Sequence, residues 1–307
     1  MSYAERFAQT HRLNYADAWR LAADHNTSML RAAVTEHPCE GEMHTPVTYY
    51  DSGKAQRREG RGALMRDTPA NRRRRWLKYQ PTFDCGELID SNDKFQGMMN
   101  FQSPLLNHHM ANVRRFIDQD VILAGFYGDA YEGDLGQTAV PFPAGNQIAV
   151  NVQAGVGTGP VGMNLAKIKM SRKRLALNKF DLNIDEPYLF CTAEQIDDLS
   201  EEIQLTSADY KEEAGPAFSR DGKLSKVWNH WIVEYQDLPI ITVAARPTQR
   251  NPVWIKSCMA LGVWMDVTSN AYPRPELDNE LYMIVKANMD CRRLDEKGCM
   301  DILSDIL

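Results

Sequence analysis

Residues 103–128, SPLLNHHMANVRRFIDQDVILAGFYG, contain the clearest helical pattern of the chain. Apolar residues recur there every three or four positions, as they do on one face of an α-helix: Leu106, Met110, Val113, Ile117, Val121 and Ala124. Ser103 followed by Pro104 is typical of a helix start. Gly125 and Gly128 fall where such a helix would end. We predict a long amphipathic helix from about Ser103 to Gly125 and expect it to organise the domain.

The segment upstream of this helix concentrates positive charge. Residues 51–80 contain ten Lys and Arg against three Asp and Glu, a net charge of +7 in a chain of −6, so all other residues together sum to −13. The β-prone residues 47–50 and 76–83 flank this mostly polar stretch, which predicts a long projecting hairpin. Because its tip has almost no apolar face, the hairpin needs a partner surface.

Two kinds of partner are compatible with the basic run Arg72–Arg75 and the adjacent Trp76. Cations beside a stacking aromatic ring are typical of nucleic-acid binding. The acidic remainder of the chain would repel a polyanion, whereas it would attract the basic hairpin of a neighbouring copy. We favour docking between copies and keep a nucleic-acid-binding accessory protein as the alternative. The candidate residues for contact between subunits are Trp19, Arg57, Arg58, Arg61, Arg66, Arg72, Arg73, Arg74, Arg75, Trp76, Gly157 and Gly159.

Shorter elements on both sides of the long helix alternate irregularly. Residues 15–33 have helical spacing and precede Pro38, which would stop a helix. A second helix is predicted over residues 163–178, and a third begins near Ala193. Strands are predicted over residues 147–152, 188–192, 231–235, 240–244, 254–265 and 281–289. The irregular order favours an α+β fold over a regular βαβ winding.

The stretch Gly157–Gly162, GTGPVG, matches the G-x-G-x-x-G pattern of dinucleotide-binding turns and lies between a predicted strand and a predicted helix. Pro160 removes one N–H donor from this turn. Asp181 and Asp185 precede the next strand, whereas a ribose-binding acid would follow it. A flexible glycine-rich loop is the better interpretation, and a dinucleotide-dependent enzyme is the less favoured alternative.

Residue patterns for other chemistry are weak. The neighbouring His108 and His109 would point about 100° apart on a helix, so they would not converge on one metal ion. We interpret the acidic doublets at 197–198 and 201–202 as solvated helix faces. Six cysteines without CxxC spacing favour reduced thiols. We expect no catalytic, cofactor-binding or metal site, and neither a membrane-spanning segment nor a secretory signal.

Several motifs resemble, in their order along the chain, those of the major capsid proteins of tailed bacteriophages with the Hong Kong 97-type fold. The resemblance covers roughly residues 85–307. Residues 115–118 and 124–133 resemble the family's spine helix and its exit, and residues 288–296 resemble its closing strand and charged tail. The segments are 115–118 (RFID), 124–133 (AGFYGDAYEG), 140–143 (VPFP), 164–167 (NLAK), 191–195 (CTAEQ), 198–199 (DL), 206–210 (TSADY), 231–233 (WIV), 238–239 (LP) and 288–296 (NMDCRRLDE).

The resemblance implies an α+β Hong Kong 97-type capsid fold with four parts. These are an N-terminal arm (1–45), an extended β-hairpin loop (46–90), a peripheral domain with the spine helix (91–135 and 265–307) and an axial domain (136–264). In such a fold the glycine-rich loop would lie near the axis of a ring of subunits.

The resemblance also implies a function and a set of partners. The chain would assemble as hexamers and pentamers into the icosahedral capsid that encloses phage double-stranded DNA, without enzymatic activity or a cofactor. Its partners would be further copies of itself, a portal protein, scaffolding and cement or decoration proteins, and packaged DNA through weak contacts, with no membrane. We expect the protein in the virion, after synthesis in the host bacterial cytoplasm.

Overall fold

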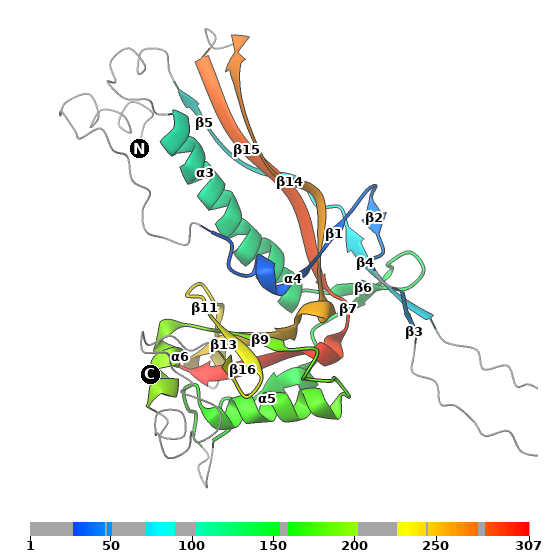
Figure 1. Cartoon of the computed structure of the whole chain (residues 1–307), viewed down its shortest axis with the longest axis vertical. Helices are drawn as coiled ribbons and strands as arrows, with labels where there is room; N and C mark the ends of the chain where they lie inside the picture. Colours follow the sequence, from blue (N-terminus) through cyan, green and yellow to red (C-terminus); the bar gives the residue numbers. More distant parts are fainter. Residues whose placement is uncertain are drawn as a thin grey trace, which may run out of the picture.

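The fold consists of three β-sheets and a long helix. The structure, a computed structural model, describes residues 27–46, 48–50, 72–89, 102–153, 159–201, 226–243, 245–275 and 280–306. The long helix lies along one face of an elongated first sheet (Figure 1). A second sheet forms a separate layer below it, and the third sheet lies to the side (Figure 1). This mixture of helices and sheets confirms the predicted α+β class.

The first sheet has four strands in the order β1-β14-β15-β5. Their bounds are β1 (Thr35–Pro38), β14 (Met259–Arg274), β15 (Glu280–Arg293) and β5 (Phe83–Ile89). The long strands β14 and β15 form an antiparallel ribbon, whereas β1 pairs with β14 in parallel. The sequence pattern did not predict β1, which is too short to show a period of its own.

The second sheet has the path β10-β11-β9-β13-β16-β8, and β12 also pairs with β13. Its strands are β8 (Gln147–Ile148), β9 (Pro187–Cys191), β10 (Lys226–Val227), β11 (His230–Glu234), β12 (Ile240–Val243), β13 (Arg246–Ile255) and β16 (Cys299–Asp305). The strand expected over 254–265 is two strands, because the 3₁₀ turn Lys256–Cys258 separates β13 from β14. The chain therefore passes from the second sheet to the first at this turn.

The third sheet holds the basic run. Its path is β2-β4-β6-β7, with β3 also paired to β4. The strands are β2 (Met43–His44), β3 (Thr48–Tyr50), β4 (Arg72–Lys78), β6 (Ala130–Glu132) and β7 (Thr138–Val140). The expected strand over 76–83 begins earlier, at Arg72, and ends at Lys78, while Phe83 opens β5. The four consecutive arginines are thus part of a strand.

The long helix is present, but it changes type along its length. It consists of α3 (Gln102–Phe116), a π-helical stretch (Ile117–Leu123) and α4 (Ala124–Tyr127). Val113, Ile117 and Val121 are buried as predicted. Ala124 is exposed, contrary to prediction, because the wider π turns rotate the following residues out of the 3.6-residue period.

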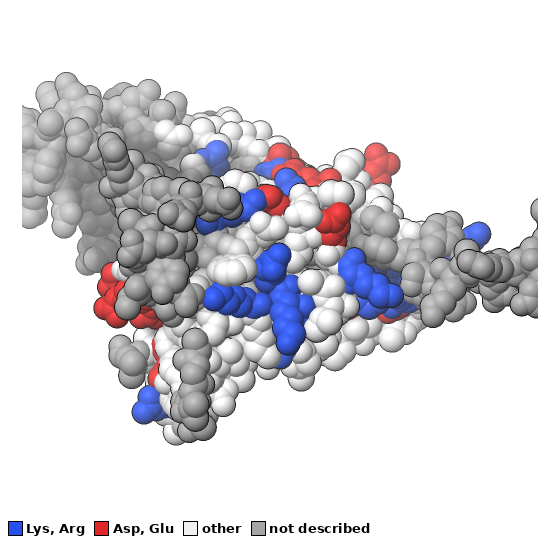
Figure 2. All heavy atoms as spheres, turned by 60° about the horizontal axis from the view of Figure 1, so that its bottom comes forward, with Lys and Arg blue, Asp and Glu red and all other residues white. Residues whose placement is uncertain are grey.

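Two shorter helices cover the second sheet. In α5 (Leu165–Leu177), Asn164 caps the helix by accepting from the Lys167 amide, and apolar residues such as Ile168 and Leu175 are buried. The helix predicted over 163–178 is thereby confirmed. Viewed with α5 turned forward, the molecule presents a face on which Lys and Arg gather (Figure 2). In α6 (Ala193–Ser200), Thr192 and Gln195 form a capping box.

Gly125 is the point at which the long helix crosses β15. A Cβ atom on this residue would lie 2.0 Å from the carbonyl oxygen of Cys291 and 2.7 Å from its carbonyl carbon. The obstacle is backbone, which cannot move aside as a flexible side chain could. Glycine is therefore required here for close approach of helix and sheet.

We expect Gly125→Ala to destabilise the protein by about 2 kcal/mol or more, although alanine is the better helix former, because the added methyl overlaps the β15 backbone. Urea unfolding of the unassembled subunit would measure the loss. Gly145→Ala is the matched control, since a Cβ there meets nothing within 4 Å. Equal stability of the two variants would contradict the close crossing.

Candidate assembly surfaces

The described candidates for contact between subunits lie mainly on β4. Arg72, Arg73 and Arg74 are exposed. The strand pairs antiparallel with β3, so that Thr48 faces Arg74 and Tyr50 faces Arg72. This pairing confirms a hairpin whose two strands are joined by residues 51–71. The candidates Trp19, Arg57, Arg58, Arg61, Arg66 and Gly157 lie outside the described residues.

Arg75 has a different environment from the three arginines before it. It is 5% exposed, and its guanidinium lies 2.6 Å from a carboxylate oxygen of Glu296 and 3.4 Å from one of Glu132. Glu132 is also its register partner on β6. The charge of Arg75 is thus compensated inside its own subunit, where it fastens the base of the hairpin to the body.

Trp76 and Lys78 add to this attachment. The Trp76 indole donates to the carbonyl of Gly133 at 2.6 Å. The Lys78 ammonium lies 3.4 Å from the centre of the Tyr131 ring, and its amide donates to the Asp290 carboxylate at 3.1 Å. Trp76, a candidate for contact between subunits, is half-buried in this intramolecular cluster. The base of the hairpin is therefore fixed by hydrogen bonds and ring contacts.

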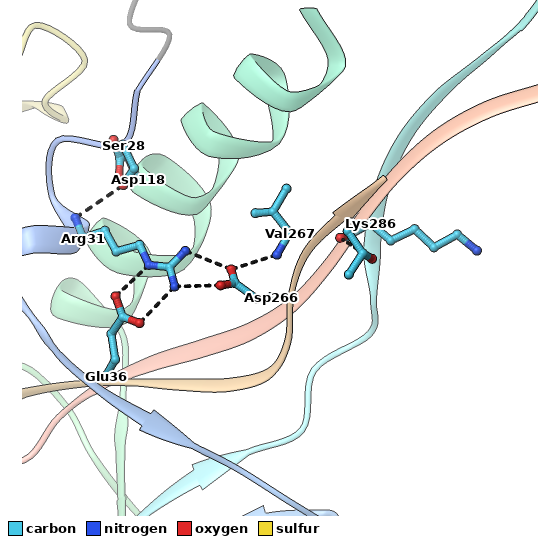
Figure 3. Close-up of polar contacts among 8 residues, drawn as sticks. Ser28, Arg31, Glu36, Asp118, Asp266, Val267 and Lys286 are labelled. Atoms are coloured by element: carbon cyan, nitrogen blue, oxygen red, sulfur yellow. Dashed lines mark hydrogen bonds and ion pairs between the residues drawn. The ribbon is translucent and has the colours of Figure 1, made fainter. Parts of the chain in front are cut away.

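A second attachment holds the N-terminal segment against the long helix (Figure 3). Asp118 is 1% exposed and accepts from the Ser28 hydroxyl at 2.5 Å and from the Met29 amide at 2.9 Å. Arg31 bridges Glu36 at 2.7 Å and Asp266 at 2.9 Å, and this cation lowers the pKa of both carboxyls. The segment from Ser28 to Glu36 is therefore fixed to the body of the protein.

The described part of the glycine-rich loop, residues 159–162, is attached to α5 by hydrogen bonds from Lys167. The Lys167 ammonium is fully buried and donates to the carbonyls of Val161 (2.7 Å), Gly162 (2.8 Å) and Leu303 (2.8 Å). Burial lowers the pKa of Lys167 to about 8. Gly159 is exposed, and a Cβ on it would meet nothing within 4 Å. The described end of the loop is thus anchored at Val161 and Gly162 and exposed at Gly159.

This arrangement argues against a dinucleotide site. At the start of α5, the amide of Met163 is bound by the Asp198 carboxylate at 2.9 Å, and the amide of Lys167 by Asn164 at 3.0 Å. A carboxylate in this position would repel a pyrophosphate. Moreover, β16 and β13 separate β8 from β9 in the sheet, so the segment does not form a βαβ unit of adjacent parallel strands.

The remaining polar candidates have local structural partners. His109 is buried, its Nδ1 lies 3.1 Å from the Cys85 sulfur, and burial lowers its pKa. The described residues contain no cluster of three or more His, Cys, Asp or Glu suited to a metal ion. Among their helices, none has the length and apolar character needed to cross a membrane.

Comparison of the sequence with known protein families gives a match over nearly the whole chain. Residues 8–305 match the phage capsid protein family. No curated protein matches the chain by sequence.

Solved capsid structures share the fold at low sequence identity. The capsid protein of cyanophage P-SCSP1u has a TM-score of 0.72 at 12% identity, covering 95% of this chain and 93% of that chain. The protein in the cyanophage Pam1 capsid has a TM-score of 0.69 at 10% identity over 96% of both chains. The capsid of a native GTA particle gives 0.65 at 10% identity over 100% of both.

We expect Arg75→Leu to lower the free energy of unfolding by about 3 kcal/mol, because it leaves the carboxylates of Glu296 and Glu132 without their shared cation. Arg74→Leu is the matched control on the same strand, and its exposed side chain should change stability by less than about 0.5 kcal/mol. Urea unfolding of the unassembled subunit measures both. Equal losses would show that Arg75 is not the anchor.

We expect Lys167→Met to destabilise the subunit by about 2 kcal/mol at pH 7, because three carbonyls lose their donor. The folded pKa of Lys167 is depressed to about 8 from 10.5. The part of its contribution that depends on protonation is therefore complete above the unfolded pKa and is lost as pH falls through about 8, whereas the hydrogen bonds to the three carbonyls persist at pH 7.

The stability difference between wild type and Lys167→Met should consequently widen between pH 8 and 10.5. Chemical denaturation at a series of pH values would measure it. A difference that stays constant over this range would contradict the buried-ammonium assignment.

The three sheets, the long helix packed on the first sheet and the hairpin attached beside it form a Hong Kong 97-type capsid fold, and the family match extends over nearly the whole sequence. The capsid-forming role of this family is structural rather than enzymatic. The chain belongs to the phage capsid protein family.

Proposed function

We propose that this capsid protein assembles as hexamers and pentamers into a closed icosahedral shell around phage double-stranded DNA. The observation that carries the proposal is the basic hairpin strand β4, which is fastened at Arg75 but exposes Arg72, Arg73 and Arg74. The chain is acidic outside residues 51–80. An exposed basic strand on an acidic protein is favourably placed to dock on the acidic surface of another copy.

We infer a four-part organisation in which each part has a role in assembly. The N-terminal arm (1–45) and the extended loop would reach neighbouring subunits, since both are attached at fixed points. We shorten the loop from the expected 46–90 to 46–82, because β5 pairs with β15 in the first sheet. The peripheral domain would comprise the long helix with β5, β14 and β15. We assign β16 to the axial domain, a change from the expected boundary, because β16 pairs with β13 and β8.

Further partners follow from the proposed shell. We infer a portal protein at one vertex, scaffolding and cement or decoration proteins, and weak contact with packaged DNA, in a virion assembled in the bacterial cytoplasm. The net charge of −13 outside the hairpin segment supports weak binding of DNA, because strong attraction of the wall would oppose filling.

We expect reversal of the exposed arginines, Arg72→Glu, Arg73→Glu and Arg74→Glu together, to weaken assembly and to reduce its dependence on salt. Light scattering and electron microscopy at a series of ionic strengths would measure this effect. Arg75 is kept in this variant so that the subunit still folds. Shells that form and survive low salt and heat like the parent would contradict docking by this strand.

The alternative, a nucleic-acid-binding accessory protein, makes a different prediction for the same strand. It requires purified wild-type protein to bind duplex DNA tightly and in a salt-dependent way, and the reversed variant to lose that binding. We expect a gel-shift assay to find no stronger binding than for other acidic proteins. Tight binding together with unchanged assembly of the variant would favour the alternative.

A further inference from the structure

Exposed cations form a stripe on α5. Lys169, Arg172 and Lys173 have the spacing i, i+3 and i+4, which places them on one side of the helix. Arg172 and Lys173 are exposed, and Lys169 is half-buried. The face that contains α5 is rich in Lys and Arg and has few acidic groups near its centre (Figure 2).

Trp228 supports two of these cations. The Lys169 ammonium lies 5.0 Å from the centre of the Trp228 ring, and the Arg172 guanidinium lies 5.8 Å from it. Trp228 is 46% exposed and has φ of +47°, a left-handed conformation that costs free energy for a bulky residue. The turn between β10 and β11 thus holds an exposed aromatic ring in place beneath the cations and limits their freedom before any partner binds.

A stripe of the opposite charge lies on α6 and its C-cap residue. Glu194, Asp197 and Glu201 have the spacing i, i+3 and i+7, and all three are exposed. The buried side of α6 carries Gln195 and Leu199, so the acids lie on the outward side. Glu194, Asp197 and Glu201 therefore form one exposed acidic stripe.

The two stripes lie on different sides of the same domain. In the view down the shortest axis of the molecule, α5 runs along its lower edge and α6 lies at the lateral end of the second sheet (Figure 1). In a shell one molecule thick, edges meet neighbouring copies, whereas broad faces meet the interior and the exterior. Two different complementary surfaces on one chain give a head-to-tail contact, which closes into a ring when the rotation between copies permits it.

We propose that the α5 stripe of one copy docks on the α6 stripe of the next copy within a ring of subunits. The inference rests on the proposed shell and names one contact within it. The edge position and the opposite charges of the two stripes favour a second copy as occupant over nucleic acid, whose binding would leave the α6 stripe without a role.

Reciprocal charge reversal tests this contact. The α5-reversed variant carries Lys169→Glu, Arg172→Glu and Lys173→Glu, and the α6-reversed variant carries Glu194→Lys, Asp197→Lys and Glu201→Lys. Each alone should reduce the assembled fraction at low salt by about tenfold or more, because like charges then face each other. The combined variant keeps the net charge of −6 and should assemble within about twofold of wild type.

Sedimentation velocity and electron microscopy would measure assembly, and thermal unfolding of the unassembled subunits would verify folding. If a reversed variant does not fold, the neutral changes Arg172→Gln with Lys173→Gln, and Glu194→Gln with Asp197→Asn, replace it. In that case a double-mutant cycle should show that the combined loss of assembly is smaller than the sum of the two separate losses.

Two results would overturn the proposal. If the combined variant folds but assembles no better than either reversed variant alone, the α5 and α6 stripes do not contact each other. Normal assembly of the α5-reversed variant would also contradict the α5–α6 contact. If that variant also loses duplex DNA binding in a gel shift, the α5 stripe binds DNA. Absence of any shell of wild type, both alone and together with the scaffolding protein of its source, would instead contradict the proposed function itself.

Discussion

The fold depends on the burial of Trp254 at the point where its parts meet. Its side chain is fully buried, and its ring centre lies 4.3 Å from that of Phe190 on β9 and 5.2 Å from that of Phe126 on α4. Its indole N–H donates to the carbonyl of Ala33 at 2.8 Å. One residue thereby joins the second sheet, the end of the long helix and the N-terminal segment. Because Trp254 lies two residues before the turn Lys256–Cys258, it also fixes where the chain passes between the two large sheets.

Positive charges are divided between the interior and the edges of this framework. Arg293 is fully buried and donates to the carbonyls of Gly128 at 2.6 Å and Val140 at 3.1 Å, which holds the exit of the long helix against β15. Arg75 and Lys167 have equivalent internal roles at the hairpin and at the glycine-rich loop. Buried cations thus attach the projecting parts to the body, whereas other cations are exposed at the edges. A subunit whose projecting parts are rigidly attached can present the charges at its edges in a reproducible geometry.

Sequence patterns predicted the elements that depend on local periodicity and missed those set by distant contacts. The long helix, α5, α6 and most strands were predicted, and so was the pairing that forms the hairpin. The exposure of Ala124 was missed because nothing local signals the π stretch. The different role of Arg75 had a usable signal: in a strand that starts at Arg72, alternation puts Arg75 on the same side as the buried Leu77. The run of four identical residues concealed that alternation.

Weak charge pairs are sufficient for contacts that are repeated around a closed ring. An exposed ion pair contributes about 0–1 kcal/mol, so the stripes on α5 and α6 would add little to a single pair of subunits. In a ring every subunit makes the head-to-tail contact twice, once through each stripe, and removal of one copy must break both. The stability of the assembly therefore comes from closure, while each individual contact stays weak enough to exchange during assembly. Opposite charges on two different edges also select the orientation of neighbouring copies. In the reversed orientation like charges would face each other and repel.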